Sequence, residues 1–329
     1  MQFAQLKRRD FITLLGGAAT WPLSVRAQRL EKAFQVGVLY PGVQAAMPSR
    51  VASIQSGLRA GGLRTEQFEI VPRTTDGNPA MLAPIAADLV ARKVDLICAQ
   101  SSAAVRAVRA VTGSIPIVAL DLESSPIDEG FIANSARPGG NVTGVFLDFP
   151  DFSKKWLEAL KEAVPQLTTV AVLWDSAVSP YQVKSVEAAA QARGFTLVLL
   201  EVRRPSELEP AFHSIVEKSA GAVVMLPSPL IGSSVKLLAN LALKQRLPAV
   251  TLFAEFAREG GLMTYGPNLL GEARHQGIMA AKILLGADPG VTPIETPSKF
   301  EFVLNLKTAN ALGLTIPAIV LLRADEVIE

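Results

Sequence analysis

Short apolar segments alternate with polar loops and amphipathic stretches along most of the chain. The apolar segments have four to six residues and no polar face, a pattern typical of parallel strands that helices cover on both sides. The sequence therefore predicts an α/β fold of parallel sheets flanked by helices. The expected strands cover residues 36–40, 68–71, 95–99, 115–120, 169–174, 196–201, 222–226, 249–253 and 262–265. The expected helices begin near residues 48, 84, 102, 152, 181, 206, 231 and 268.

Two helices carry more detailed predictions. Ser206 and Glu209 have the spacing of a capping box, in which each side chain satisfies an unpaired amide at the start of a helix. The apolar pattern that begins at residue 231 predicts one continuous helix to about residue 245.

The stretch 136–147 combines a cluster of turn residues with a short strand and divides the chain into two similar halves. Two halves with the same alternation suggest two lobes joined by a hinge, with a cleft between them. Ligands of parallel sheets bind beyond the carboxyl ends of the strands. The loops that follow the strands are therefore expected to carry the function.

Length and charge are consistent with two such lobes. A chain of 329 residues suits two α/β lobes of roughly 120–150 residues each. Residues 1–27 contain four cations and one carboxylate, so without them the formal charge falls from +2 to −1. A nearly neutral chain offers no basic face for nucleic acid, and we predict no nucleic-acid partner.

The N-terminus reads as a targeting segment. Lys7-Arg8-Arg9-Asp10-Phe11-Ile12 is a twin-arginine pattern, and the apolar run 11–19 is too short to span a membrane as a stable helix. We expect residues 1–27 to be a twin-arginine signal peptide, cleaved after Ala27, that engages the Tat export machinery. The single cysteine, Cys98, lies within an expected strand and offers neither a disulfide nor a lipid anchor. The mature protein is thus expected to be periplasmic.

Aromatic residues with a polar tip gather at the ends of expected strands. Tyr40, Trp174 and Tyr265 each end a strand, and Tyr181 follows soon after Trp174. Such side chains bind half-apolar ligands by stacking and hydrogen bonding, although Tyr and Trp also favour half-exposed edges in general. We take these four as candidate ligand-binding residues, with Ser228 in the loop after strand 222–226.

Polar residues at strand ends suggest a site for a charged ligand. Ser101 and Ser102 stand where a strand gives way to a helix, whose free amides suit a carboxylate; serine is also a favoured N-cap, and the two roles are compatible. Carboxylates that could pair with a ligand ammonium follow other strands, although each could also be a solvated loop charge. These carboxylates are Asp121, Glu123, Asp175 and Glu255.

Motifs for catalysis or for cofactors are missing from the sequence. The two histidines, His213 and His275, stand beside no Ser or Cys nucleophile, and no Gly-x-Ser-x-Gly elbow or phosphate-binding glycine loop occurs. Cysteine and histidine are too few for the usual zinc sets. We therefore predict neither an enzyme nor a cofactor or metal site, and a secreted α/β enzyme is the least favoured alternative.

Several stretches resemble the substrate-binding proteins of ABC transporters, in particular the tryptophan/tyrosine-binding-like group. The matching stretches run in order from about residue 34 to the C-terminus. They are Ser-Ala-Arg-Pro-Gly-Gly-Asn-Val-Thr-Gly at 135–144, Leu-Lys-Glu-Ala-Val-Pro at 160–165, Val-Ala-Val-Leu-Trp at 170–174, Gly-Leu-Met-Thr-Tyr-Gly-Pro-Asn at 261–268, and the tail at 305–317 and 323–328.

The resemblance implies a type I periplasmic-binding-protein fold, in which the chain crosses between the lobes three times. Lobe 1 would comprise residues 34–140 with 266–298, and lobe 2 residues 145–259 with 300–329. The first crossing would then form part of a three-stranded hinge. Its glycines would absorb the backbone change on closure, and its polar residues would lie beside the cleft. These expected hinge residues are Gly139, Gly140, Asn141, Thr143 and Gly144.

Related amino-acid binders hold the ligand carboxylate at serines on a helix start, which falls on Ser101 and Ser102 here. Their ammonium partner is an acidic residue, for which Asp121 or Glu255 is the candidate. Many members have Gly-Asp-Pro after the fourth strand, where this chain has Asp-Leu-Glu-Ser-Ser-Pro at 121–126.

The resemblance thus predicts a periplasmic solute-binding component of an ABC importer. It would bind a small organic ligand, such as an aromatic amino acid or aromatic acid, and deliver it to a membrane permease powered by a separate ATPase. The alternative is a binding module of the same fold that presents its ligand to a sensor or chemoreceptor.

Overall fold

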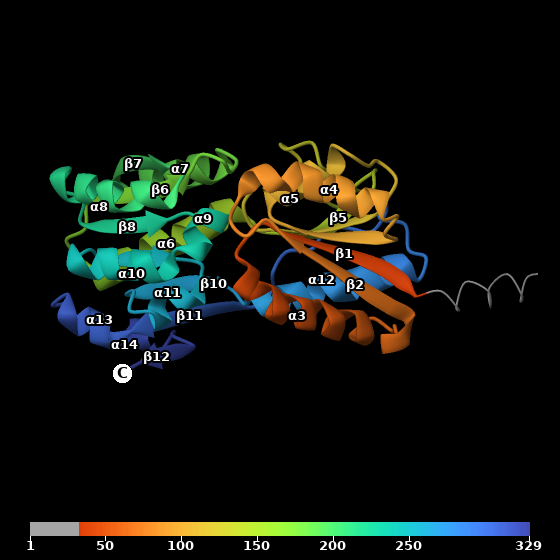
Figure 1. Cartoon of the computed structure of the whole chain (residues 1–329). Coiled ribbons are helices and arrows are strands. Elements are labelled where there is room, and N and C mark those ends of the chain that lie inside the picture. The colour runs from red at the N-terminus through yellow and green to blue at the C-terminus, as the bar shows by residue number, and fades with distance from the viewer. Residues whose placement is uncertain (1–32) are drawn as a thin grey trace, which may run out of the picture.

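Two sheets, each covered by helices on both faces, form two lobes that lie side by side (Figure 1). The computed structural model describes residues 33–329. The predicted fold class, a two-lobed α/β fold with parallel sheets, is confirmed. The predicted signal peptide at 1–27 and its cleavage site lie outside the described residues. In residues 33–329, no helix is long and apolar enough to cross a membrane.

Lobe 1 contains a five-stranded parallel sheet in the order β2-β1-β3-β4-β5. Helices α4 and α5 cover one face, and α3 and α12 cover the other (Figure 1). The strands are β1 (Phe34–Tyr40), β2 (Phe68–Thr74), β3 (Leu96–Gln100), β4 (Ile117–Asp121) and β5 (Val142–Phe146). The helices are α3 (Met47–Ala60), α4 (Leu82–Ala91), α5 (Ser102–Arg109) and α12 (Leu269–Leu284).

Lobe 2 contains a seven-stranded sheet in the order β12-β11-β10-β9-β8-β6-β7, in which only the described pair β10 and β11 is antiparallel. The strands are β6 (Thr169–Asp175), β7 (Thr196–Val202), β8 (Ala222–Met225), β9 (Ala249–Thr251), β10 (Met263–Pro267), β11 (Phe300–Asn305) and β12 (Glu326–Ile328). The helices are α6 (Phe149–Ala163), α7 (Tyr181–Arg193), α8 (Leu208–Glu217), α9 (Pro229–Ser233), α10 (Val235–Lys244), α11 (Ala254–Arg258), α13 (Leu306–Ala311) and α14 (Ala318–Leu321).

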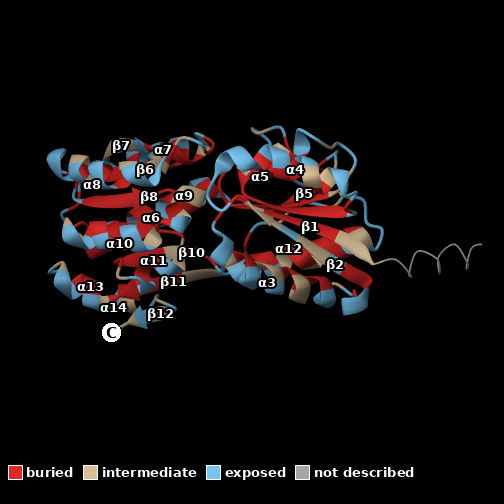
Figure 2. Cartoon of the chain, in the orientation of Figure 1, coloured by how far each residue is buried: buried red, intermediate tan, exposed pale blue. Residues whose placement is uncertain are grey.

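The central strands are buried on both faces, as their unbroken apolar runs predict (Figure 2). One buried apolar cluster extends through both lobes, from Val36 under α3 to Trp156 on α6. Two further clusters fill the opposite faces of the two sheets. Because the first cluster is continuous, the lobes share packed side chains near the places where the chain passes between them.

The chain passes between the lobes three times. It leaves lobe 1 after β5, returns from β10 into α12, and leaves again after Glu295, which bridges to Val145 on β5. The predicted first boundary, between residues 140 and 145, shifts to a position after Phe146, because the whole of β5 pairs with β4 in lobe 1. Residues 266 and 267 belong to β10 and therefore to lobe 2.

Both detailed helix predictions in lobe 2 are wrong. Pro205 opens a 3-10 turn ahead of α8, so the helix starts late, and no side chain caps it at Glu207. The predicted capping box of Ser206 and Glu209 therefore does not form. The expected helix at 231–245 is two helices, α9 and α10, because the backbone leaves the helical conformation at Ser234 (φ −109°, ψ 8°).

Candidate functional site

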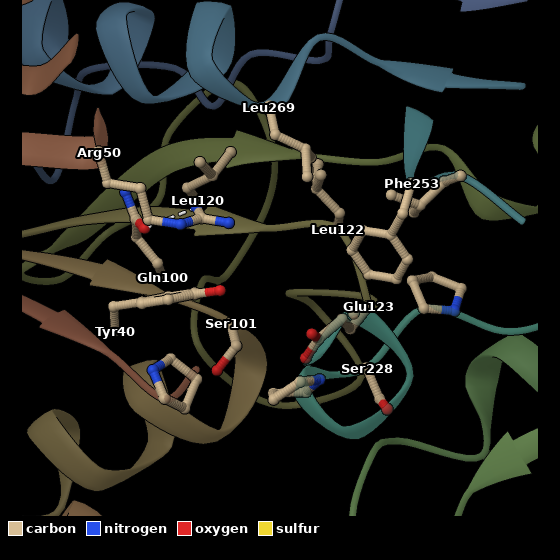
Figure 3. A pocket seen from close by; sticks show the side chains of 15 residues that line it. Tyr40, Arg50, Gln100, Ser101, Leu120, Leu122, Glu123, Ser228, Phe253 and Leu269 are labelled. Atoms are coloured by element: carbon tan, nitrogen blue, oxygen red, sulfur yellow. Dashed lines mark hydrogen bonds between the residues drawn. The ribbon is translucent and has the colours of Figure 1, made fainter. Parts of the chain in front are cut away.

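A cleft opens between the lobes where the strands of both sheets end at their carboxyl side (Figure 3). About 530 Å³ of space lies between its walls, a volume that includes open solvent at the mouth of the cleft. Lobe 1 contributes loops after β1, β3 and β4 together with α3 and α12, and lobe 2 contributes loops after β8 and β9. The lining residues are Tyr40, Pro41, Arg50, Gln100, Ser101, Leu120, Leu122, Glu123, Pro227, Ser228, Pro229, Gly232, Leu252, Phe253 and Leu269.

Ser101 forms the turn between β3 and α5. Its backbone has φ 108°, a conformation that costs a residue other than glycine free energy. The Oγ atom of Ser101 accepts a hydrogen bond from the Ala104 amide at 3.2 Å, so the serine is a true N-cap. Ser101 therefore lines the cleft as predicted, with its hydroxyl already engaged by the helix.

The predicted anion site at the start of α5 already holds a carboxylate of the protein. Glu123 Oε2 accepts hydrogen bonds from the Ser102 amide at 3.3 Å and from the Ser102 hydroxyl at 3.2 Å. Ser102 itself is fully buried and does not line the cleft. The start of α5 thus binds Glu123, and the carboxylate of Glu123 reaches the cleft (Figure 3).

Asp121 lies below the cleft and supports the loop that carries Glu123. Its Oδ1 atom accepts hydrogen bonds from the amides of Glu123 at 2.9 Å and Ser124 at 3.2 Å, and its Oδ2 atom accepts one from the Ser124 hydroxyl at 2.5 Å. It is fully buried and does not line the cleft. Asp121, one of the two predicted ammonium partners, is therefore a loop-supporting residue, and Glu123 takes the lining position.

Burial dominates the electrostatics of these carboxyl groups. Burial raises the pKa of Asp121 to about 6, although hydrogen bonds from Ser124 and Glu123 act to lower it. Burial and the charge of Asp121 raise the pKa of Glu123 to about 8. Burial also raises the pKa of Asp175 at the end of β6. Across residues 33–329, no salt bridge reaches any of these three groups.

Arg50 is the one cationic side chain among the described residues that line the cleft. It projects from α3, and its guanidinium lies 4.0 Å from the centre of the Tyr40 ring. Its Nη1 atom donates a hydrogen bond to Gln100 Oε1 at 2.9 Å. Figure 3 shows Arg50 beside Gln100 and above Tyr40, on the lobe 1 side of the cleft.

The remaining walls of the cleft are largely apolar. Phe253 comes from lobe 2 and leucines come from both lobes. Ser228 lines this side, and its hydroxyl accepts a hydrogen bond from the Ile231 amide at 3.1 Å as the N-cap of α9. The cleft thus joins a charged lobe 1 wall to an apolar lobe 2 wall.

Besides Ser102 and Asp121, four further predicted ligand residues do not line this cleft. Trp174 and Tyr181 are half-buried in lobe 2, with the Tyr181 ring 6.4 Å from that of Phe149. Glu255 is exposed on α11. Tyr265 stacks on Phe152 at 5.2 Å and lines a separate cavity on lobe 2.

The predicted hinge residues tie β5 into lobe 1. Asn141 Nδ2 donates a hydrogen bond to the Ile115 carbonyl at 2.8 Å, and Thr143 Oγ1 donates one to the Thr292 carbonyl at 2.9 Å. Gly144 has φ 144°, and a Cβ atom there would lie 2.2 Å from the Ala119 carbonyl oxygen.

The two glycines that precede β5 also stay within lobe 1. The Gly139 amide donates to the Gly290 carbonyl at 2.9 Å, and Gly140 follows at the amino end of the strand. The crossing itself comes after Phe146, where β5 ends. The prediction that residues 139–144 form the hinge is corrected accordingly.

Sequence reasoning missed Arg50, Gln100, Phe253 and Leu269. Arg50 carries no local signal in the sequence, since the other arginine of α3, Arg59, faces solvent. Phe253 follows β9 and obeys the same strand-end rule that identified Tyr40. Because its side chain is apolar, the sequence pattern assigned it to the expected strand 249–253. In the described part of the chain, no group of three His, Cys, Asp or Glu side chains could hold a metal ion.

Comparison with known proteins gives consistent matches over nearly the whole described chain. A family model described as ABC transporter substrate binding protein matches residues 35–328. A protein named tyrosine-binding protein from Clostridioides difficile (strain R20291) is 28% identical over 233 residues, which cover 70% of this chain. That match spans 66% of the relative, slightly less than two thirds of its length.

Two solved structures align with almost the full described chain. A structure described as an ABC domain in complex with L-Trp, from Streptococcus pneumonia, has a TM-score of 0.83 at 25% identity and covers 90% of this chain and 100% of its own. A conserved domain protein from Vibrio cholerae has a TM-score of 0.82 at 23% identity, with the same coverage of 90% and 100%. The latter supports the fold alone.

Proposed function

The chain belongs to the family of ABC transporter substrate-binding proteins, and from this premise we propose that it binds an aromatic amino acid in the cleft between its lobes. The ammonium group of the ligand pairs with Glu123, and the side chain lies among Tyr40, Phe253 and the leucines of the apolar wall. The relative named for tyrosine binding and the structural neighbour in complex with L-Trp support this class of ligand.

The observation that carries the proposal is the carboxylate of Glu123. It is 8% exposed, lines the cleft and pairs with no cation among residues 33–329. A buried carboxylate without a partner is costly. A ligand ammonium would provide the missing counter-charge, and its binding would favour the ionised form of Glu123.

Ligand binding is coupled to closure of the lobes in this proposal. A ligand held first by lobe 1 recruits lobe 2, which shifts the protein towards the closed form. The closed form then docks on a membrane permease powered by a separate ATPase. The protein works in the periplasm after export by the Tat machinery and cleavage after Ala27, and it neither uses a cofactor nor performs catalysis.

Calorimetric titration and thermal unfolding with L-tyrosine and L-tryptophan test the ligand class. We expect saturable binding of at least one of them, with glucose as a control that does not bind. At 100 times the dissociation constant, the ligand should raise the free energy of unfolding by about 2.7 kcal/mol. No response to any aromatic amino acid would contradict the proposal.

The importer role is tested separately, by the genes that flank the gene of this chain. Genes for a permease and an ATPase would support import. A histidine kinase gene in their place would favour the sensor alternative.

A further inference from the structure

The start of α5, which the sequence analysis assigned to the ligand carboxylate, is occupied by Glu123. A ligand carboxylate placed there would have to displace Glu123, whose Oε2 atom already accepts from the Ser102 amide and hydroxyl. A zwitterionic ligand therefore needs a separate anion site elsewhere in the cleft. Arg50 is the one cationic lining residue in the part of the chain that the structure describes.

Arg50 is held in place by its neighbours in lobe 1. The Tyr40 ring supports the guanidinium at 4.0 Å, and Gln100 Oε1 accepts one of its five N–H groups at 2.9 Å. No carboxylate between residues 33 and 329 forms a salt bridge with Arg50. The guanidinium thus retains its full charge and several donors for an anion in the cleft.

A buried glutamine fixes the orientation of the Gln100 side chain, which in turn bonds to Arg50. Gln276 on α12 is fully buried, and its Nε2 atom donates to the Val118 carbonyl at 2.7 Å and to the Ala99 carbonyl at 3.4 Å. Its Oε1 atom must then accept, and it does so from Gln100 Nε2 at 3.0 Å. Gln100 consequently presents its own Oε1 atom to Arg50, and the two backbone carbonyls set the direction of the whole chain of hydrogen bonds.

We propose that Arg50 binds the ligand carboxylate and that Gln276, acting through Gln100, is the positioning residue for Arg50. The inference rests on the proposed function and specifies its ligand as a compound that carries both an ammonium group for Glu123 and a carboxylate for Arg50. It also assigns a role to α12, which reaches lobe 1 from lobe 2 and delivers Gln276 beneath the cleft.

The test compares L-tyrosine with L-tyrosinamide, which keeps the ammonium group and the ring but has no carboxylate. Wild-type protein should prefer L-tyrosine by roughly 10- to 100-fold, the usual effect of hydrogen bonds to a charged group. Arg50→Gln should bind L-tyrosine and L-tyrosinamide with about equal affinity, mainly because its affinity for L-tyrosine is lower than that of wild type. Arg59→Gln, at an exposed position of the same helix, is the matched control and should keep the wild-type preference.

Gln276→Met tests the positioning role, with the thermal unfolding temperature as the check on folding. We expect the preference for L-tyrosine over L-tyrosinamide to fall by roughly 3- to 10-fold while L-tyrosinamide still binds with nearly wild-type affinity. A purely structural role would weaken both ligands equally and leave the preference unchanged, and that result would overturn the assignment of Gln276.

The outcomes separate this inference from the proposed function. If L-tyrosine binds and Arg50→Gln keeps the wild-type preference, the inference is overturned and the proposed function stands. If no aromatic amino acid binds, the proposed function fails, and the small molecule that co-purifies with the protein decides the inference by mass spectrometry. An acidic molecule that is retained by wild type and lost in Arg50→Gln supports the inference, and any other result overturns it.

Discussion

Glu123 is a buried carboxyl group whose charge state should affect the stability of the protein and, in the proposed function, the binding of the ligand. Its pKa is raised to about 8 in the folded protein, first by burial and then by the charge of Asp121, from an ordinary value of 4.5. Between about pH 4.5 and pH 8, the carboxyl group of Glu123 therefore keeps its proton in the folded state and has lost it in the unfolded state. The stability that this proton contributes is present below about pH 4.5 and is lost as pH rises towards 8.

Glu123→Gln should remove most of this pH dependence. In chemical denaturation between pH 5 and 9, the free energy of unfolding of ligand-free wild type should fall with pH, and that of the variant should fall less. A smaller slope of the same sign should remain, because burial also raises the pKa of Asp121. The variant should bind L-tyrosine roughly 10- to 100-fold more weakly at pH 8.

Glu255→Gln is the control for this prediction, because Glu255 is exposed and lies away from the cleft lining. It should match wild type in both pH slope and affinity. Identical slopes for wild type and Glu123→Gln would show that Glu123 titrates normally, and unchanged affinity would remove it from the ammonium site.

The residues of the cleft also show which features of the site the sequence could predict. The strand-end rule selected Tyr40, Ser101 and Ser228, and the structure places all three in the lining of the cleft. It did not predict which of two neighbouring carboxylates would line the cleft, because hydrogen bonds within the loop hold Asp121 beneath the cleft and leave Glu123 in the lining. It also could not reveal that Glu123 would fill the helix start, since residues 102 and 123 meet only in the folded chain.

Among the elements of lobe 1, helices α3 and α12 pack closely against each other on one face of the sheet. Two glycines, Gly57 and Gly277, face each other where the helices meet. A Cβ atom on Gly57 would lie 1.9 Å from the Arg274 carbonyl oxygen, and one on Gly277 would lie 2.3 Å from the Ile54 carbonyl oxygen. The sequence predicted both helices, but it gave no sign of this contact, because more than 200 residues of chain separate the partners.

Gly57→Ala should therefore destabilise the protein by about 1–3 kcal/mol, despite the higher helix propensity of alanine. The added methyl group forces the helices apart, since the atom it meets belongs to the backbone of α12. Urea denaturation gives the free energy of unfolding. Gly113→Ala is the matched control, because a Cβ atom there meets nothing within 4 Å. A Gly57→Ala protein as stable as wild type would mean that the helices separate without cost.

A cluster of aromatic rings in lobe 2 stands beside the three crossings between the lobes. Phe152 lies just after the first crossing, Tyr265 just before the second, and Phe300 just after the third. Tyr265 stacks on Phe152 at 5.2 Å and on Phe300 at 5.6 Å. The sequence placed Tyr265 in the ligand site because it ends a strand. In the fold Tyr265 packs instead between Phe152 and Phe300, so the segments that lead to or from the three crossings meet in lobe 2.

Gln182 forms a direct hydrogen bond between the two lobes. It projects from α7 in lobe 2, is 2% exposed, and donates through Nε2 to the Glu123 carbonyl of lobe 1 at 3.0 Å. The same atom donates to the Pro227 carbonyl within lobe 2 at 3.0 Å. Only the first of these bonds depends on the lobes being together, so it stabilises the closed form relative to the open form.

Gln182→Met should shift this equilibrium towards the open form. The lost hydrogen bond between the lobes corresponds to about 0.5–1.5 kcal/mol, so L-tyrosine should bind roughly 2- to 12-fold more weakly. Small-angle scattering should give a larger radius of gyration for the ligand-free variant than for ligand-free wild type, and saturating L-tyrosine should reduce the difference. Gln191→Met, at an exposed position of the same helix, should match wild type in both measurements. If Gln182→Met also matches wild type, the contact between Gln182 and Glu123 contributes nothing to closure, and the ligand and the other contacts between the lobes must supply the whole of it.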